Sequence, residues 1–491
     1  MQNLKRLLSN DLEDRQELVL LGTLVLLPNL IVLFFLVWPG FLQADQVYSS
    51  IRLKIGEPDQ WHSIVYTVLT FPFFDNAQGL GAYGLVYDVL FSLSCAWSLV
   101  RLRSLGILAS QRACLVLTAV FALSPSFLFY TNVLYSTESA FMIALLPLTV
   151  FIIEIVHSKG AWLRSPGNWI RLAVFLFIAL ELRKNAVLLV FFILLILLLC
   201  YRARWRQILA ATAVLALAFA LTQGVARLAQ VAPSPAQELV SIPAQQIARV
   251  YVDGGTIPDD IKARLDEIHP EEYWRENYLP SLADNEKRGI EPDAQFLADW
   301  IALGIQNPGS YANAYLDVTR SFWLWGDQPS HNEYMNAVDF TLSYVWTPEY
   351  VEQEFGGKAQ LSEGFYETMG RRSTLRDAAV LGWDYLMTAR PVPVITDVLK
   401  GVFFNIALPF YLCLAVLVVS IAKRRWSLLI IATPLWSTLL SFFVAAPVAC
   451  YRYSAMLYLI LPALVLLMAK TMREKKPQQS SKERETDALS P

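Results

Sequence analysis

The sequence predicts an all-α polytopic membrane protein, with about ten transmembrane helices and a mainly helical extracytoplasmic domain. Of its 491 residues, 55% are hydrophobic, which is too apolar for a row of soluble domains. Several apolar segments meet or approach the roughly 20 residues that cross a bilayer. One long polar block, residues 231–401, interrupts these segments and shows little of the alternation that strands require. These three observations together indicate the fold class.

The apolar segments divide the chain into modules. The first segment follows Lys5 and Arg6 and is longer than a signal-peptide core, so we expect an uncleaved signal-anchor helix. The N-terminal transmembrane module covers residues 1–230, and the C-terminal helices cover residues 402–470. The polar tail, residues 471–491, is expected to be disordered. The expected spans are residues 18–39, 79–100, 113–131, 139–157, 169–182, 186–201, 207–230, 402–422, 428–446 and 453–470.

The distribution of Lys and Arg predicts the orientation in the membrane. Basic residues gather in the loop after every second expected span, and the positive-inside rule places these loops and both termini in the cytoplasm. The first outer loop, residues 41–78, and the block 231–401 then lie outside the plasma (inner) membrane. The triplet Arg183-Lys184-Asn185 interrupts the apolar stretch 169–201. If this stretch forms two short helices with the triplet at the outer face, the basic loops that follow stay in the cytoplasm.

The polar block carries signals for helices. Pro243 suits a helix start, and the stretch DDIKARLDEI places its apolar residues on one helical face. Asn307 followed by Pro308 resembles an N-cap with Pro at the first helical position. We therefore expect residues 231–401 to form a mainly helical domain.

The composition also excludes several classes of site. All five cysteines lie in or beside apolar runs, so no disulfide framework is expected. The polar block has more acidic than basic residues and contains no Gly-rich phosphate loop, so no nucleic-acid partner is expected. The four histidines are widely separated in the chain, which argues against a cluster of metal ligands.

Two acidic residues stand beside apolar spans at the predicted outer face. An ionised group costs roughly 2.5–3.5 kcal/mol at the bilayer midplane, so such residues are candidates for function. Asp45 could act as a general base toward a sugar hydroxyl, or it could be an ordinary solvated loop acid. Glu138 could be a second catalytic carboxylate, or it could cap a helix that begins near Ser139, for which Ser136 and Thr137 are also available as caps.

Cations and polar residues on the same predicted face are candidates for binding substrate. Arginine offers a planar fork to phosphate and lysine a point charge, although Lys184 could instead snorkel to lipid headgroups. His62 could hydrogen-bond a substrate, or it could be a core or interface histidine. The predicted substrate-binding residues are Gln46, His62, Arg183, Lys184, Asn185, Gln246, Arg249 and Arg452.

The order of these features resembles the GT-C superfamily of membrane glycosyltransferases. The stretch ADQVYSSIRLKIGEPDQWHS resembles the first outer loop of that superfamily, with Asp45 at the position of the catalytic acid. YSTES is similar to the second polar turn, where relatives often carry Asp in place of Glu138. Ser63 follows His62 where relatives often show His-Pro. ELRKNAVLL is similar to an Arg/Asn turn between short helices, and SIPAQQIARV to the start of the outer domain in a Gram-positive branch.

The resemblance implies transfer of a sugar from a polyprenyl-phosphate-linked donor to a cell-envelope glycan or glycolipid, with Asp45 as the general base. The expected partners are membrane lipid, the lipid-linked donor and the acceptor. A membrane transporter or flippase of envelope precursors, a glycan ligase or polymerase, and a non-catalytic scaffold are the alternatives. The sequence shows no inverted repeat of the kind that many transporters contain. It assigns no cofactor beyond the lipid-linked co-substrate, and the two carboxylates leave a divalent cation open.

Overall fold

The computed structural model describes residues 6, 12–74, 76–282, 286–329, 332–341, 347–356, 363–364, 366, 373–446 and 448–474. Over these residues the chain is almost wholly helical, and the only sheet is one pair of two-residue strands. The predicted all-α class is therefore confirmed. The expected disordered tail lies outside the described residues from position 475 onward, while its first residues continue the last helix.

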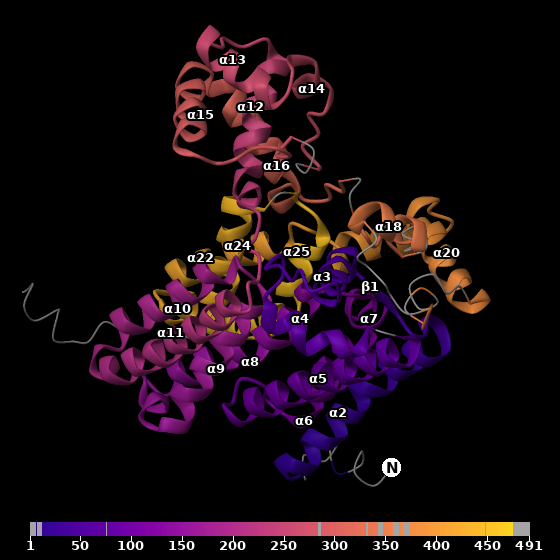
Figure 1. Cartoon of the computed structure of the whole chain (residues 1–491). Helices are drawn as coiled ribbons and strands as arrows, with labels where there is room; N and C mark the ends of the chain where they lie inside the picture. Colours follow the sequence, from indigo (N-terminus) through magenta and orange to yellow (C-terminus); the bar gives the residue numbers. More distant parts are fainter. Residues whose placement is uncertain are drawn as a thin grey trace, which may run out of the picture.

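Most helices assemble into one apolar body, drawn in the lower part of Figure 1. Every expected apolar span overlaps helices of this body, and several of the spans are interrupted by turns. Its helices are α2 (Asp14–Ile31), η1 (Val32–Val37), α5 (Ala77–Ser104), α6 (Gln111–Leu123), α7 (Pro125–Leu128), η3 (Phe129–Val133), α8 (Thr137–His157), α9 (Pro166–Leu182), α10 (Ala186–Cys200), α11 (Trp205–Leu228), α22 (Leu408–Lys423), α23 (Ser427–Ile431), α24 (Thr433–Ala445), α25 (Tyr451–Tyr458) and α26 (Leu461–Arg473).

Several helices of the apolar body could cross a membrane. Among the described residues, α2 with η1, α5, α8 and α11 are long and apolar enough, and three bent helix pairs raise the number to seven. The expected number of ten spans is not confirmed, because α9, α10 and α24 contain only 17, 15 and 13 residues. Helix α8 is buried along most of its length, whereas only a minor part of α2 with η1 and of α11 is buried. This distribution places α8 at the centre of the body.

The predicted break at residues 183–185 is present. Helix α9 ends at Leu182, and Arg183 has an extended backbone with φ −142° and ψ 120°. Helix α10 begins at Ala186. The apolar stretch 169–201 is therefore two helices with the polar triplet between them.

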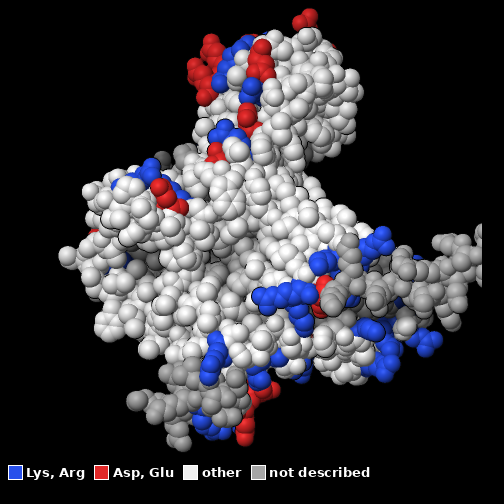
Figure 2. Space-filling view, turned by 180° about the vertical axis from the view of Figure 1, so that it is seen from behind, with Lys and Arg blue, Asp and Glu red and all other residues white. Residues whose placement is uncertain are grey.

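The basic loops lie together at one end of the apolar body, which we call the basic end. Lys470 Nζ donates to the carbonyl oxygen of Gly106 at 2.9 Å, and Arg425 forms an ion pair with Glu474 at 2.9 Å. Arg101 at the end of α5 forms an ion pair with Glu154 at the end of α8. Figure 2 shows Lys and Arg side chains over the lower part of the molecule, apart from the charged unit at the top. The charge pattern of the sequence and the fold thus agree on which loops share an end.

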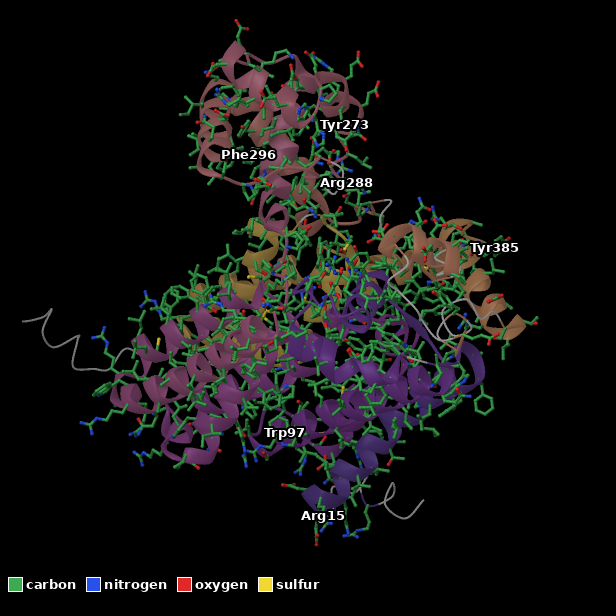
Figure 3. All side chains as sticks on the ribbon, viewed as in Figure 1. Arg15, Trp97, Tyr273, Arg288, Phe296 and Tyr385 are labelled. Atoms are coloured by element: carbon green, nitrogen blue, oxygen red, sulfur yellow. The ribbon has the colours of Figure 1, made fainter. Side chains whose placement is uncertain are left out.

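A separate helical unit, the head unit, projects from the opposite end of the apolar body (Figure 1). It has its own core, in which Ile247 and Trp274 are fully buried. Figure 3 shows Phe296 and Tyr273 within this unit. The head unit consists of η6 (Ala236–Val240), α12 (Ser241–Asp253), α13 (Asp259–Ile268), α14 (Glu271–Glu276), α15 (Ala294–Gln306) and α16 (Pro308–Trp323).

The rest of the polar block packs on the apolar body instead of on the head unit. Tyr334 and Met387 are buried in the core of the body, and Val351 is buried in a smaller cluster that includes Val47 and Tyr135. Residues 231–401 thus contribute to two parts of the fold. These further helices are α17 (Ala337–Thr341), α18 (Pro348–Phe355), α20 (Thr374–Thr388), α21 (Pro393–Val398) and η7 (Leu399–Phe403).

A short parallel ladder joins the first loop to the turn before α8. Strand β1 (Phe41–Leu42) pairs with β2 (Leu134–Tyr135), and the backbone N–H of Gln43 donates to the Tyr135 carbonyl at 3.1 Å. Each strand leads directly into a helix, β1 into α3 (Ala44–Lys54) and β2 into α8. If the register Leu42 to Tyr135 is continued, Asp45 corresponds to Glu138. The ladder therefore sets two acids at equivalent places on neighbouring strand-to-helix turns.

The ladder depends on a close contact between Tyr135 and α5. A Cβ added at Gly84 would collide with the Tyr135 hydroxyl and lie 3.2 Å from Leu33 Cδ1. We expect Gly84→Ala to lower the free energy of unfolding by roughly 1–3 kcal/mol, because overpacking forces the buried ring to move. Thermal unfolding in detergent measures this loss. Gly224→Ala on α11, where nothing lies within 4 Å, is the matched control and should be neutral or slightly stabilising.

Candidate functional site

Asp45 and Glu138 occupy the second positions of two helices whose N-termini lie side by side. Gln43 precedes α3, and its side-chain amide donates to Asp45 Oδ2 at 2.7 Å. Ser136 caps α8 in a capping box with Ser139. The alternative role of Glu138 as a cap is therefore wrong, because Ser136 caps the helix and the helix begins at Thr137. Both carboxylates benefit from the positive end of a helix dipole.

Arg452 lies between these acids. It is the second residue of α25, and its Nη1 is 3.7 Å from Asp45 Oδ2. Its Nε is 3.5 Å from Glu138 Oε1 and 3.2 Å from Glu333 Oε1. A cation at a helix N-terminus is disfavoured by the helix dipole, so the three carboxylates are needed to hold it there. The arginine is mostly buried, which makes this compensation necessary.

Glu333 was not predicted from the sequence. It is fully buried and lies just before α17, next to Asn332, whose Oδ1 accepts from the backbone N–H of Tyr451 at 2.8 Å. Burial raises the pKa of Glu333, and the charge of Arg452 opposes that rise. Within the described residues neither carboxylate oxygen has an aligned hydrogen bond, so its contact with Arg452 is an ion pair without hydrogen-bond geometry. Glu333 lies in a polar stretch without periodicity, so no sequence pattern distinguishes it from other acids of that stretch.

Arg183, at the break between α9 and α10, also contacts Glu138. Its Nη1 donates to Glu138 Oε1 at 2.6 Å. The guanidinium groups of Arg183 and Arg452 lie 5.3 and 5.5 Å from the centre of the Tyr453 ring. Two arginines therefore share one carboxylate and one aromatic ring. Glu138 is engaged in positioning both cations.

His62 stands at the edge of this cluster, just before α4 (Ile64–Thr70). Burial is the main cause that lowers its pKa, while the charges of Asp45 and Glu138 raise it and that of Arg183 lowers it. Its Nε2 is buried and has no hydrogen-bond partner in the described part of the chain. The imidazole is therefore expected to be neutral at pH 7, with one ring nitrogen available to a ligand.

The lowered pKa of His62 predicts a pH dependence of stability. As pH falls below 6.5, the ordinary value, the unfolded chain takes up a proton before the folded chain does, so the free energy of unfolding decreases. His62→Gln should weaken this decrease between pH 7 and pH 5. Thermal unfolding of both proteins across that range measures the difference. Equal slopes for the two proteins would contradict the prediction.

The remaining predicted residues lie around or away from the cluster. Gln46 Nε2 donates to the Tyr66 hydroxyl at 2.8 Å, beneath the first turn of α3. Lys184 Nζ donates to Ser234 Oγ at 2.5 Å, and burial lowers its pKa to about 8. Asn185 precedes α10 as its N-terminal flanking residue. These three residues border the cluster without a direct contact to Asp45 among the described interactions.

Gln246 and Arg249 are not brought to the cluster. Gln246 accepts from Trp300 Nε1 at 2.8 Å inside the head unit. Arg249 forms ion pairs with Asp253 and Asp317, each at 2.8 Å. Both residues therefore connect helices of the head unit to one another.

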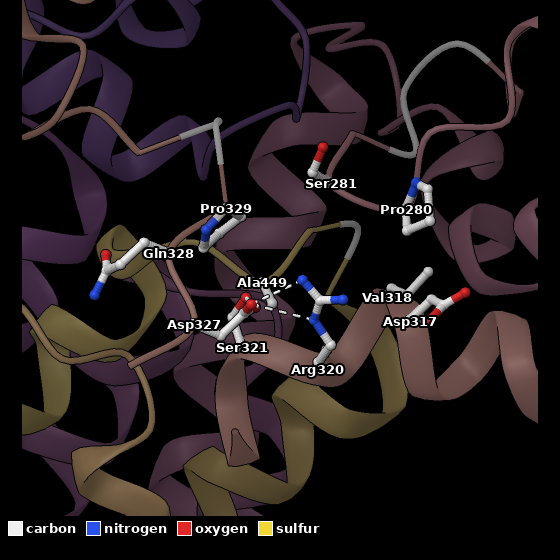
Figure 4. A pocket seen from close by; sticks show the side chains of 10 residues that line it. All are labelled: Pro280, Ser281, Asp317, Val318, Arg320, Ser321, Asp327, Gln328, Pro329 and Ala449. Atoms are coloured by element: carbon white, nitrogen blue, oxygen red, sulfur yellow. Dashed lines mark hydrogen bonds and ion pairs between the residues drawn. The ribbon is translucent and has the colours of Figure 1, made fainter. Parts of the chain in front are cut away.

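A cavity lies where the head unit meets the apolar body, close to Arg452 along the chain. Its volume is about 390 Å³, and Ala449, three residues before Arg452, forms part of its wall. Figure 4 shows Arg320 of α16 paired with Asp327 in its wall, and the Nη2 to Oδ1 distance is 2.8 Å. The cavity is lined by Pro280, Ser281, Asp317, Val318, Arg320, Ser321, Asp327, Gln328, Pro329 and Ala449. It offers a space lined by both polar and apolar side chains at the junction of the head unit and the apolar body.

No group of three or more His, Cys, Asp or Glu residues in the described ranges is arranged to hold a metal ion. In the cluster the three carboxylates are separated by the guanidinium of Arg452. The arrangement is therefore suited to an acid-base step beside fixed positive charge.

Comparison with known proteins identifies a family. The model of a family described as "Family of unknown function (DUF6020)" matches residues 73–484. The chain belongs to this family. The DUF6020 match includes Glu138, Arg183, Glu333 and Arg452, whereas Asp45 and the β1 strand precede it. No curated protein and no solved structure matched the sequence.

Proposed function

We propose that this protein is a membrane glycosyltransferase of the GT-C type. It transfers a sugar from a polyprenyl-phosphate-linked donor to a cell-envelope glycan or glycolipid at the outer face of the plasma membrane. The observation that carries this proposal is the exposed carboxylate of Asp45 beside the mostly buried Arg452, at the end opposite the basic loops, where Arg183 and Arg452 both contact Glu138.

Asp45 is suited to be the general base. Its side chain is 38% exposed, whereas those of Glu138 and Glu333 are 4% and 0% exposed. An acceptor hydroxyl can therefore approach Asp45, while the other two acids are occupied by cations. In the proposed step Asp45 takes the hydroxyl proton as that oxygen attacks the anomeric carbon. The bond from the anomeric carbon to the phosphate oxygen breaks, and direct displacement inverts the configuration.

The leaving group requires positive charge. Polyprenyl phosphate departs with the bonding electron pair, so negative charge develops on its oxygen. Arg183 and Arg452 supply fixed cations, and the N-termini of α3, α8 and α25 meet at the same place. Glu138 acts as a positioning residue that holds both guanidinium groups.

Membrane orientation supports a lipid-linked donor. If the chain has the expected ten-span topology with both termini in the cytoplasm, the basic end lies inside and the Asp45 cluster outside. Nucleotide sugars are cytoplasmic, so a donor at the outer face must arrive on a lipid carrier. The head-unit cavity beside Ala449 lies on the same side and could admit a polar acceptor.

The experiment compares cells that carry the native protein with cells that carry Asp45→Asn, after the variant is shown to reach the membrane. Mass spectrometry measures lipid-linked sugars and the sugar and linkage content of the envelope. Accumulation of one polyprenyl-phosphate sugar, with loss of that sugar from an envelope glycan, supports the transferase and names both substrates. Unchanged pools contradict it and move the transporter and scaffold alternatives ahead.

A further inference from the structure

Helix α20 turns apolar side chains outward and an arginine inward. Leu375, Leu381 and Tyr385 are each more than half exposed, and none of the exposed residues of this helix carries a charge. Arg376 is buried instead, and its guanidinium carbon lies 4.2 Å from the centre of the Phe41 ring. A helix at the surface of a water-soluble domain normally shows its polar side to solvent. The exposed side of α20 therefore does not suit water.

This apolar surface continues beyond α20. Helices α21 and η7 together with α22 are apolar enough for a broken membrane span or a re-entrant loop, with a bend of 53° between the two parts. The surface leads directly into α22, because the first part exposes Val394, Ile395, Val398 and Val402.

The same segment also reaches the first candidate span. Helix α20 packs against η1, which forms one end of that span. The exposed side chains of η1 are apolar as well, namely Phe34, Phe35 and Leu36. Figure 1 shows α20 at the flank of the apolar body, below the head unit, and Figure 3 places Tyr385 at the same flank. Residues 374–403 therefore lie between the exposed apolar surfaces of two candidate spans.

The charged residues after α20 are arranged as at a membrane surface. Arg390 Nη2 donates to both carboxylate oxygens of Asp397, at 2.7 and 2.9 Å, so two exposed charges neutralise each other. Lys400 is half-buried, and its long stem can lie along apolar surface while its ammonium group reaches the lipid headgroups. An apolar face combined with such charged groups is typical of a helix that lies in the membrane interface.

We propose that residues 374–403 lie in the bilayer leaflet on the side of the head unit, with the exposed sides of α20 and α21 against lipid acyl chains. The last part of the expected extracytoplasmic block, residues 231–401, then belongs to the membrane. A second copy of the chain would also cover an apolar face. The continuity with η1 and α22 favours lipid, because candidate spans meet lipid on that same surface.

The segment also contacts the surroundings of the candidate site. Arg376 stacks on Phe41, which belongs to strand β1. Trp383 Nε1 donates to the carbonyl oxygen of Tyr334 at 2.7 Å, and Tyr334 follows Glu333 in the chain. The lipid surface of α20 therefore borders the elements that hold the Asp45 cluster.

Photocrosslinking of the full chain in its native membrane tests the proposal. The photoreactive residue p-benzoylphenylalanine replaces Tyr385, and mass spectrometry identifies the adduct after irradiation. Phe219 on the candidate span α11 is the lipid-facing reference, and Ile301 on α15 of the head unit is the water-facing reference. The yield of phospholipid adduct at Tyr385 should be within about threefold of that at Phe219 and at least roughly tenfold above that at Ile301. A yield as low as that at Ile301 overturns the proposal, as does an adduct between two copies of the chain in place of the lipid adduct.

A matched pair of charge substitutions gives a second test. Leu381 and Ile301 are 52% and 54% exposed, and each lies inside a helix, so Leu381→Asp and Ile301→Asp share the cost in helix propensity. Thermal unfolding is measured for the full chain in phosphatidylcholine nanodiscs. Leu381→Asp should unfold roughly 2 °C or more below Ile301→Asp, because only Leu381 would place a charge against lipid. Equal unfolding temperatures of the two variants would mean that α20 faces water.

Discussion

Asp45→Asn is expected to lower the rate of sugar transfer by about 10²–10⁴-fold, the usual contribution of a general base. Asparagine keeps the shape of the side chain and can still accept the hydrogen bond from Gln43, so the fold should be retained. The measurement is single-turnover transfer by purified protein, with a polyprenyl-phosphate sugar as donor and an isolated envelope glycan as acceptor. Circular dichroism and gel filtration establish that the variant is folded.

The matched control for this prediction is Glu57→Gln. Glu57 lies in the same loop as Asp45 and its side chain is exposed, so Glu57→Gln removes one exposed acid from that loop. Its transfer rate should stay within about twofold of the native rate. A similar loss in both variants would indicate a general electrostatic effect of the loop. Native-like transfer by Asp45→Asn would remove the base from the mechanism.

The helices of the apolar body could be predicted from the sequence because long apolar segments have few alternatives. Where water is scarce, a segment such as 139–157 must form a helix, because only a helix pairs all its backbone N–H and C=O groups within the segment. The break at Arg183 could be predicted for the same reason, since a charged triplet between two apolar runs is costly at membrane depth. Both features depend only on local composition.

The number of spans could not be predicted in the same way. Three candidate spans are bent by 48°, 53° and 54°. Each bend has a proline at the start of the following helix, Pro125, Pro409 or Pro462. Proline suits the first helical turn and favours a boundary before it, but the sequence alone does not tell whether the two parts continue through the membrane.

The candidate site was predicted in part. Asp45, Glu138 and Arg452 were selected because they lie beside apolar runs at the predicted outer face, and they prove to be neighbours. Glu333 gave no such signal, and the loop that carries it reaches α25 through a bond from Asn332 to Tyr451, 119 positions apart. A tertiary contact of that range leaves no trace in a local pattern.

The ladder that places Asp45 beside Glu138 was also missed. Each strand has two residues, which is too short for alternation to be recognised. Gln246 and Arg249 were grouped with the site because they follow a helix start on the predicted outer side. The sequence could not show that their side chains point into the head unit, because that depends on how α12 packs against its neighbours.

Arg452→Met is expected to be among the most destabilising substitutions in the chain, with a loss of about 3–5 kcal/mol. Methionine fills similar space but leaves Asp45, Glu138 and Glu333 without the cation they share. Breaking a buried pair by removing one partner is costly because the remaining charge is uncompensated. Chemical denaturation in detergent measures the loss, if the transition is two-state.

Glu333→Gln should partly rescue Arg452→Met. Glu333 is fully buried, so neutralising it removes the largest uncompensated charge that the arginine substitution creates. Glu349→Gln on the exposed face of α18 removes an acid of the same kind and should give no rescue.

Lowering the pH should reduce the deficit of Arg452→Met, as Glu333→Gln does. Burial raises the pKa of Glu333, so the folded state binds this proton more tightly than the unfolded state. The stability that Glu333 contributes is therefore present below pH 4.5 and is lost as the pH rises above that value. Without Arg452 the pKa should rise further. The deficit of Arg452→Met should therefore shrink as pH falls from 7 toward 5, and this shrinkage should be absent when Glu333 is glutamine. A deficit that is unchanged by pH and by Glu333→Gln would mean that Arg452 stabilises the fold through packing and not through charge.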